Sequence, residues 1–150
     1  MNVIHADQRL ELRGSRSIFL AGPTPRASHV PSWRPDALRI LEELQFDGDV
    51  LVPERRDWQT RFSYADQVEW EYAGLQACSR IVFWVPRRLD TLPGLTTNVE
   101  FGFFLNSGRV LYGRPDEAEK CRYLDWLYEK VTGRKPLTRL VDLLTAAVRP

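Results

Sequence analysis

Cysteine, histidine and methionine are scarce in this chain of 150 residues, which contains two cysteines, two histidines and one methionine. Cys78 and Cys121 are too few for the disulfide framework that stabilises small secreted proteins. Together with His5 and His29 they show no spacing typical of zinc ligands. We therefore expect neither a disulfide scaffold nor a bound metal.

A strong charge of either sign is also absent, because 21 Lys and Arg residues balance 20 Asp and Glu residues to a net charge of +1. Binding to nucleic acid or to an anionic membrane leaves a basic electrostatic footprint, so neither partner is expected. The first 14 residues alternate polar and apolar side chains, which matches neither a signal peptide nor a transmembrane helix. A cytoplasmic location is the default expectation.

The composition is that of an ordinary globular protein, with 43% hydrophobic and 27% charged residues, and the length predicts a single domain over residues 1–150. Short apolar runs predict buried strands at 17–21, 50–52, 80–85 and 110–112. Helical spacing predicts helices at 32–44, 63–78 and 97–106, with two more between 117 and 148. This alternation predicts a three-layer α/β/α domain, flavodoxin-like or Rossmann-like. We expect a parallel sheet of about four to five strands and a helical C-terminal tail.

Glu100 is the residue that most strongly indicates chemistry. It stands near the start of the predicted 97–106 helix, after a strand and a Gly/Pro loop. Ligands of open α/β sheets bind outside the carboxyl ends of the strands, so Glu100 should face a crevice. The helix N-terminus would favour its ionised form by a few tenths to about 1 kcal/mol, and a glycosyl-transferring nucleophile needs that form. Thr97-x-x-Glu100 equally matches a capping box, in which Glu100 only bonds back to the backbone of Thr97.

Glu71 is the best candidate for a second carboxylate. Helical spacing places it near the buried stripe of the 63–78 helix, whereas Glu69 falls on a more solvated face. A carboxyl group whose pKa is raised by a like-charged neighbour can protonate a leaving base. A helix-surface glutamate without a catalytic role is the alternative.

The turn Gly22-Pro23-Thr24-Pro25-Arg26 follows the strand at 17–21, where nucleotides often bind in such folds. Its two prolines remove backbone donors, so it predicts a rigid rim for a base or ribose, or else a plain turn. Arg26 could pair with an anionic substrate group or simply be solvated. Trp58, in a polar loop, could stack on a nucleobase, although most tryptophans belong to cores or interfaces.

Together these segments resemble the nucleoside 2-deoxyribosyltransferase-like family. The matching segments, in order, are 18–23, 67–71, 81–86, 97–102 and 108–110, and the most specific of them contains Glu100-Phe101-Gly102. The resemblance implies a flavodoxin-like enzyme that cleaves the N-glycosidic bond of a 2′-deoxynucleoside. Glu100 would attack the anomeric carbon, and another base or water would resolve the deoxyribosyl-enzyme. It also implies a homo-oligomer whose active sites are completed by a neighbouring subunit.

The chain departs from the family pattern at two places. Classical members carry an aspartate six residues before the nucleophile, where this chain has Gly94, and Asp90 is the nearest acidic residue upstream. A tyrosine that follows the first strand in classical members is missing from Gly22-Pro23-Thr24. Glu71 lies close to the position of a family aspartate that assists the departing base, so the resemblance moves that role to Glu71.

Our first hypothesis is a double displacement on a small-molecule nucleoside or nucleotide, with Glu100 as nucleophile, Glu71 as proton donor, and no metal or cofactor. The residues expected to contact substrate are Gly22, Pro23, Thr24, Arg26, Trp58, Asp90, Thr97 and Asn98. A second hypothesis is hydrolysis of (deoxy)nucleoside 5′-monophosphates, with Thr96, Thr97 and Asn98 bonded to the phosphate. The third is a non-catalytic domain that senses a nucleotide.

Overall fold

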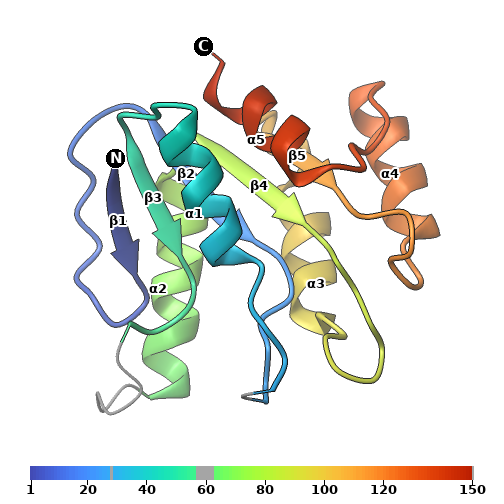
Figure 1. Cartoon of the computed structure of the whole chain (residues 1–150), viewed down its shortest axis with the longest axis horizontal. Helices are drawn as coiled ribbons and strands as arrows, with labels where there is room; N and C mark the ends of the chain where they lie inside the picture. The colour runs from blue at the N-terminus through green and yellow to red at the C-terminus, as the bar shows by residue number, and fades with distance from the viewer. Residues whose placement is uncertain (28, 57–62, 150) are drawn as a thin grey trace.

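The computed structural model describes residues 1–27, 29–56 and 63–149. Within these residues five strands form one sheet, in the order β1-β3-β2-β4-β5 (Figure 1). The strands are β1 (Asn2–His5), β2 (Ser17–Ala21), β3 (Asp49–Val52), β4 (Arg80–Trp84) and β5 (Val110–Gly113). Every pairing is parallel, so the predicted parallel α/β sheet is confirmed.

Helices cover both faces of this sheet (Figure 1). The helices are α1 (Arg34–Glu43), α2 (Tyr64–Ala77), α3 (Leu95–Phe104), α4 (Arg122–Thr132) and α5 (Leu140–Val148). Alternate residues of β2 define the two cores, because successive side chains of a strand point to opposite faces. Phe19 packs in the core under α2, α3 and α4, whereas Ile18 and Leu20 pack in the core under α1 and α5. The predicted three layers and helical C-terminal tail are therefore confirmed.

The start of α3 differs from the prediction. The helix begins at Leu95, after Gly94 in the left-handed conformation (φ 59°), and it has no side-chain cap. Thr97 is therefore a buried residue of the first turn rather than an N-cap. The capping box proposed for Thr97 and Glu100 is wrong, since Gly94 turns the chain into the helix before Thr97 is reached. The helix also ends earlier than predicted, and a short 3₁₀ turn (Leu105–Ser107) follows it.

The start of α2 agrees with the prediction. The Ser63 hydroxyl accepts a hydrogen bond from the backbone N–H of Asp66, and the Asp66 carboxylate accepts one from the Ser63 N–H. This capping box holds the N-terminal turn of α2. Gly74 lets the middle of the helix approach the sheet, because a Cβ there would lie 2.9 Å from both Leu51 and Phe19 side-chain atoms.

Strand β1 was not predicted from the sequence. It forms the edge of the sheet beside β3, and Ile4 is its only fully buried residue. An edge strand with one buried side chain lacks the apolar run that marks the central strands. No helix in the described part of the chain is long and apolar enough to cross a membrane.

Candidate active site

A cavity of about 780 Å³ lies at the carboxyl ends of β2 and β3, on the side of the sheet covered by α2 and α3. Its walls come from the loop after β2, from Pro53 and Glu54 after β3, from one side of α2, and from the first turns of α3. This is the crevice that the fold class places outside the strand ends.

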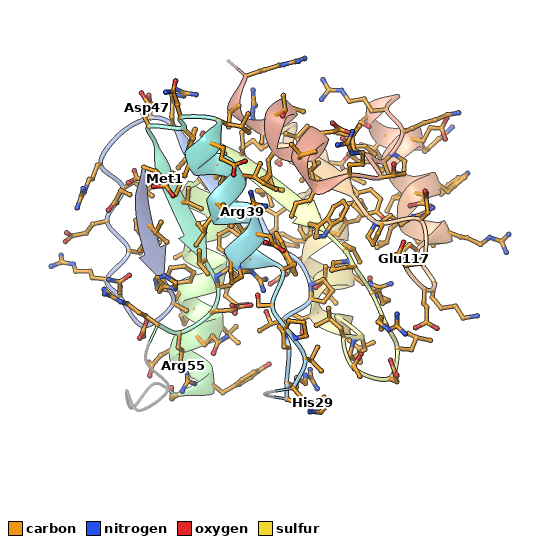
Figure 2. All side chains as sticks on the ribbon, in the orientation of Figure 1. Met1, His29, Arg39, Asp47, Arg55 and Glu117 are labelled. Carbon is orange, nitrogen blue, oxygen red and sulfur yellow. The ribbon has the colours of Figure 1, made fainter. Side chains whose placement is uncertain are left out.

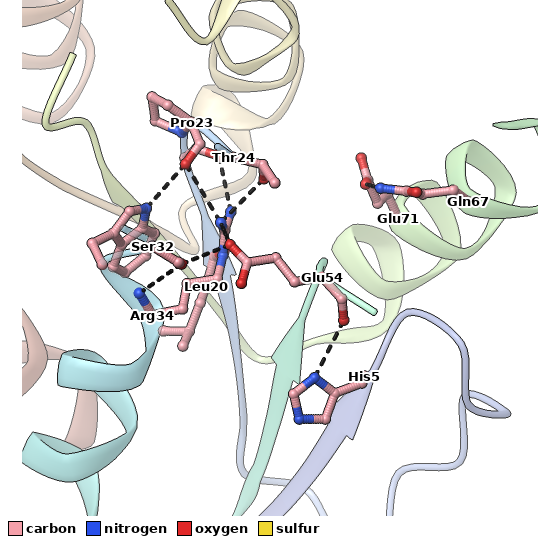
Figure 3. A network of polar contacts seen from close by, with 11 residues as sticks. His5, Leu20, Pro23, Thr24, Ser32, Arg34, Glu54, Gln67 and Glu71 are labelled. Carbon is pink, nitrogen blue, oxygen red and sulfur yellow. Dashed lines mark hydrogen bonds and ion pairs between the residues drawn. The ribbon is translucent and has the colours of Figure 1, made fainter. Parts of the chain in front are cut away.

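Glu71 of α2 and Glu100 of α3 meet in this cavity. Both side chains are half-buried and line it, and their carboxyl groups are joined by a hydrogen bond. Glu71 is also held by Gln67, one helical turn earlier, whose Nε2 donates to Glu71 Oε1 at 2.9 Å (Figure 3). The packing of two helices on one sheet face therefore unites two carboxylates that lie 29 residues apart in the chain.

Burial raises the pKa of both carboxyl groups. The pKa of Glu100 rises to about 7, chiefly through loss of hydration and then through the negative charge of Glu71, while the positive charge of Arg34 opposes the rise. Burial likewise raises the pKa of Glu71. Two carboxyl groups this close cannot both ionise easily, so the pair favours holding one proton, and the hydrogen bond between the groups raises the pKa of Glu100 while it lowers that of Glu71.

The raised pKa of Glu100 differs from the expectation that a helix N-terminus favours the ionised form of this side chain. Because α3 begins at Leu95, Glu100 is the sixth residue of the helix. The helix dipole acts mainly within the first turn, and Glu100 stands beyond that turn. Desolvation and the like charge of Glu71 then dominate its ionisation.

Gly94 stands where the resemblance in the sequence implies an aspartate. A Cβ at Gly94 would lie 2.6 Å from Cγ of Pro23, and the backbone there is in the left-handed region. Any side chain at this position would strain the backbone and collide with the loop after β2. The only carboxyl group described in contact with Glu100 is that of Glu71.

The other predicted contact residues separate into two groups. Gly22, Thr24, Arg26 and Thr97 line the cavity. Pro23 stands behind its wall: its carbonyl accepts a hydrogen bond from Trp33 Nε1.

The structure does not bring Asp90 and Asn98 to the cavity. Asp90 is exposed and bonds to the hydroxyl of Thr91, in a separate surface hollow shared with residues 117 and 119. Asn98 lies two residues before Glu100, hence on a different side of α3, where it accepts a hydrogen bond from Arg87. Trp58 lies outside the described residues.

Two charged residues of the site were missed from the sequence. Arg34, the first residue of α1, is only 1% exposed and forms an ion pair of 2.6 Å with Glu54 (Figure 3). Glu54 lies two residues after the end of β3 and lines the cavity. The position of Glu54 just beyond a strand's carboxyl end could have identified it, whereas nothing in the local sequence indicates that Arg34 is buried.

Comparison with protein families identifies the family of this chain. Residues 15–118 match the family described as nucleoside 2-deoxyribosyltransferase like, and the chain belongs to that family. The matched segment includes Glu71, Glu100 and the strands β2 to β5, whereas β1, α4 and α5 lie outside it. No curated protein matches the chain significantly.

Proposed function

We propose that this protein cleaves the N-glycosidic bond of a (2-deoxy)nucleoside and transfers the deoxyribosyl group to another base or to water. The observation that carries the proposal is the Glu71–Glu100 pair inside a cavity large enough for a nucleoside, in a chain of this family. A pair of carboxyl groups that shares one proton supplies a nucleophile and an acid together.

In the first half-reaction the Glu100 carboxylate attacks the anomeric carbon and forms a glycosyl ester. The C–N bond breaks, its electron pair goes to the base nitrogen, and Glu71 supplies the proton to the leaving base. The shared proton therefore passes along the hydrogen bond from Glu100 to Glu71 before the attack. This order follows because a protonated carboxyl group is a poor nucleophile.

In the second half-reaction an acceptor base or water loses its proton to Glu71 and attacks the anomeric carbon. The ester bond to Glu100 breaks, and Glu100 leaves as a carboxylate. Retaining glycosidases hold their two carboxyl groups about 5–5.5 Å apart, so substrate has to enter between the two groups that touch here. Neither half-reaction requires a metal or a cofactor.

The charges of the cavity favour a nucleoside over its 5′-monophosphate. Arg34 is paired with Glu54, and the Glu71–Glu100 pair carries one negative charge when it holds one proton. Arg26, which is exposed, is the one cationic side chain among the described residues that line the cavity. A phosphate dianion would therefore meet like charge at the inner end of the cavity.

We also propose that a second copy of the chain covers the outer faces of α2 and α3. Apolar side chains repeat every fourth residue on both helices and remain exposed: Tyr64, Val68 and Tyr72 on α2, and Leu95, Val99 and Phe103 on α3. The rings of Tyr72 and Phe103 lie 6.3 Å apart, so the two rows form one surface. Glu100 is the only charged residue of α3, which suits contact with another apolar surface.

This surface is continuous with the cavity, because Tyr64, Val68 and Leu95 belong to both. A second copy on it would close the cavity mouth. Phe103→Asp should therefore lower the oligomer mass in sedimentation equilibrium, whereas Trp126→Asp, on the exposed side of α4, should not. A wild-type protein that is monomeric at high concentration would contradict this assembly.

Base release measured by chromatography tests the reaction. Nucleosides and their 5′-monophosphates are incubated with wild type, Glu100→Gln and the control Glu69→Gln, each with and without an acceptor base. We expect release or exchange of the base with wild type and Glu69→Gln, and none with Glu100→Gln. Saturable nucleotide binding without any base release would favour the sensing function instead.

A further inference from the structure

Arg34 fixes the backbone of the cavity wall after β2. Its Nε donates to the carbonyl of Leu20 at 3.0 Å, Nη2 to that of Gly22 at 2.9 Å, and Nη1 to that of Pro23 at 3.4 Å (Figure 3). Nη1 also donates to the hydroxyl of Thr24 at 3.1 Å. One guanidinium group therefore binds four of the five residues between Leu20 and Thr24, from the end of β2 into the loop.

Glu54 also binds the guanidinium group of Arg34. Its Oε1 accepts from Arg34 Nη1 at 2.6 Å and from the Ser32 hydroxyl at 2.7 Å. Arg34 is fully buried, and a buried charge is costly unless it is paired and hydrogen-bonded. A neutral side chain could occupy this space without that cost. The position of the pair beside the reacting carboxyl groups therefore requires an explanation.

The positive charge of Arg34 reaches both carboxyl groups of the site and lowers the pKa of each, against the effect of burial. The charged and titratable groups around the pair are Arg34 from α1, Glu54 after β3, Arg26 on the loop after β2 and Tyr64 on α2. Among these, only Arg34 is fully buried.

We propose that Arg34 and Glu54 form a positioning pair for the Glu71–Glu100 site: Arg34 shapes the cavity wall at residues 20–24, and its charge, balanced by Glu54, sets the proton occupancy of the two carboxyl groups. The inference deepens the proposed function, since that proton is the one delivered to the leaving base. Arg34 and Glu54 act through other groups and are not themselves nucleophile or acid.

Removing the positive charge of the pair and removing its negative charge should shift the titration midpoint of the two carboxyl groups in opposite directions. Arg34→Gln removes the positive charge, so the midpoint should rise, whereas Glu54→Gln leaves Arg34 unbalanced, so the midpoint should fall. We expect shifts of about half a pH unit to one pH unit each, since nearby charges move carboxyl pKa values by such amounts or more. Arg34→Lys keeps the charge but loses the planar fork, so it should leave the midpoint in place and lower kcat/KM.

The experiment is a titration of the glutamate side-chain carboxyl carbons by NMR in the full chain, combined with the pH profile of base release. The matched control is Arg39→Gln, because Arg39 is an exposed residue of α1 (labelled in Figure 2). This variant should change neither the titration midpoint nor the pH profile. Opposite shifts for Arg34→Gln and Glu54→Gln support the inference.

No shift in Glu54→Gln, or shifts of the same sign in both variants, would overturn it. If Arg34→Gln does not fold, Glu54→Gln and Arg34→Lys still decide the outcome. The inference then requires that the titration midpoint falls in Glu54→Gln and stays in place in Arg34→Lys. The NMR titration needs no turnover. Absence of base release would therefore defeat the proposed function alone, and unmoved midpoints would defeat this inference alone.

Discussion

Replacing Glu100 by glutamine should abolish turnover and at the same time stabilise the fold at alkaline pH. Burial and the charge of Glu71 raise the pKa of Glu100 from 4.5 to about 7. The native state therefore binds more protons than the unfolded state between these two values. Its free energy of unfolding must then fall as the pH rises through this window.

The size of the effect follows from the pKa shift. A difference of about 2.5 pKa units corresponds to about 3 kcal/mol when the carboxyl group is fully ionised at pH 8. At pH 5 the native Glu100 is protonated and the cost is only about 1 kcal/mol by the same relation. Glutamine carries no charge and can still donate to Glu71. The free energy of unfolding of the variant should therefore exceed that of wild type by about 3 kcal/mol at pH 8, which corresponds to about 6–12 °C in melting temperature.

Urea unfolding of wild type and Glu100→Gln at pH 5 and pH 8 measures this difference. The matched control is Glu69→Gln, because Glu69 is an exposed residue of α2 outside the cavity. The control should show no pH-dependent change in stability. If Glu100→Gln were no more stable than wild type at pH 8, or were equally stabilised at both pH values, the desolvation argument would be refuted.

Three further substitutions test other parts of the structure. Glu71→Gln should lower kcat by about 10²–10⁴-fold, with a smaller loss for substrates whose base leaves without a proton, as measured over a series of leaving bases. Gly94→Ala should cost about 1–3 kcal/mol in urea unfolding, because the left-handed backbone and the contact with Pro23 oppose a Cβ, and an unchanged midpoint would contradict the geometry. Tyr112→Phe should cost about 1 kcal/mol of unfolding free energy by removing the partly buried hydrogen bond to Asp125, with no change in base release expected.

Much of the fold could be predicted because the relevant interactions are local in sequence. The central strands are short apolar runs that are buried on both faces, and the capping box of Ser63 and Asp66 marks the start of α2. The periodicity of α2 also placed Glu71 toward the buried side and Glu69 toward solvent. Edge strand β1 escaped prediction, since only Ile4 is fully buried there.

The start of α3 could not be predicted, because two signals overlap at the same place. Thr97 and Glu100 match a capping box, but Gly94 starts the helix earlier by adopting a left-handed conformation against Pro23. That contact is between two loops that are distant in the sequence, so local sequence patterns cannot predict it. The expectation that the helix N-terminus governs the ionisation of Glu100 failed for the same reason, because the pKa of Glu100 is raised rather than lowered.

The sequence by itself determined the class of sheet, the order of its helices and the two glutamates worth testing, because apolar periodicity and strand-end position are local properties. Only the tertiary structure decided that Glu71 and Glu100 meet in one cavity and that Arg34 is buried beside Glu54. It likewise left Asp90 and Asn98 outside the cavity. These features depend on which helices and loops pack together, and on how much water that packing removes from each charged group.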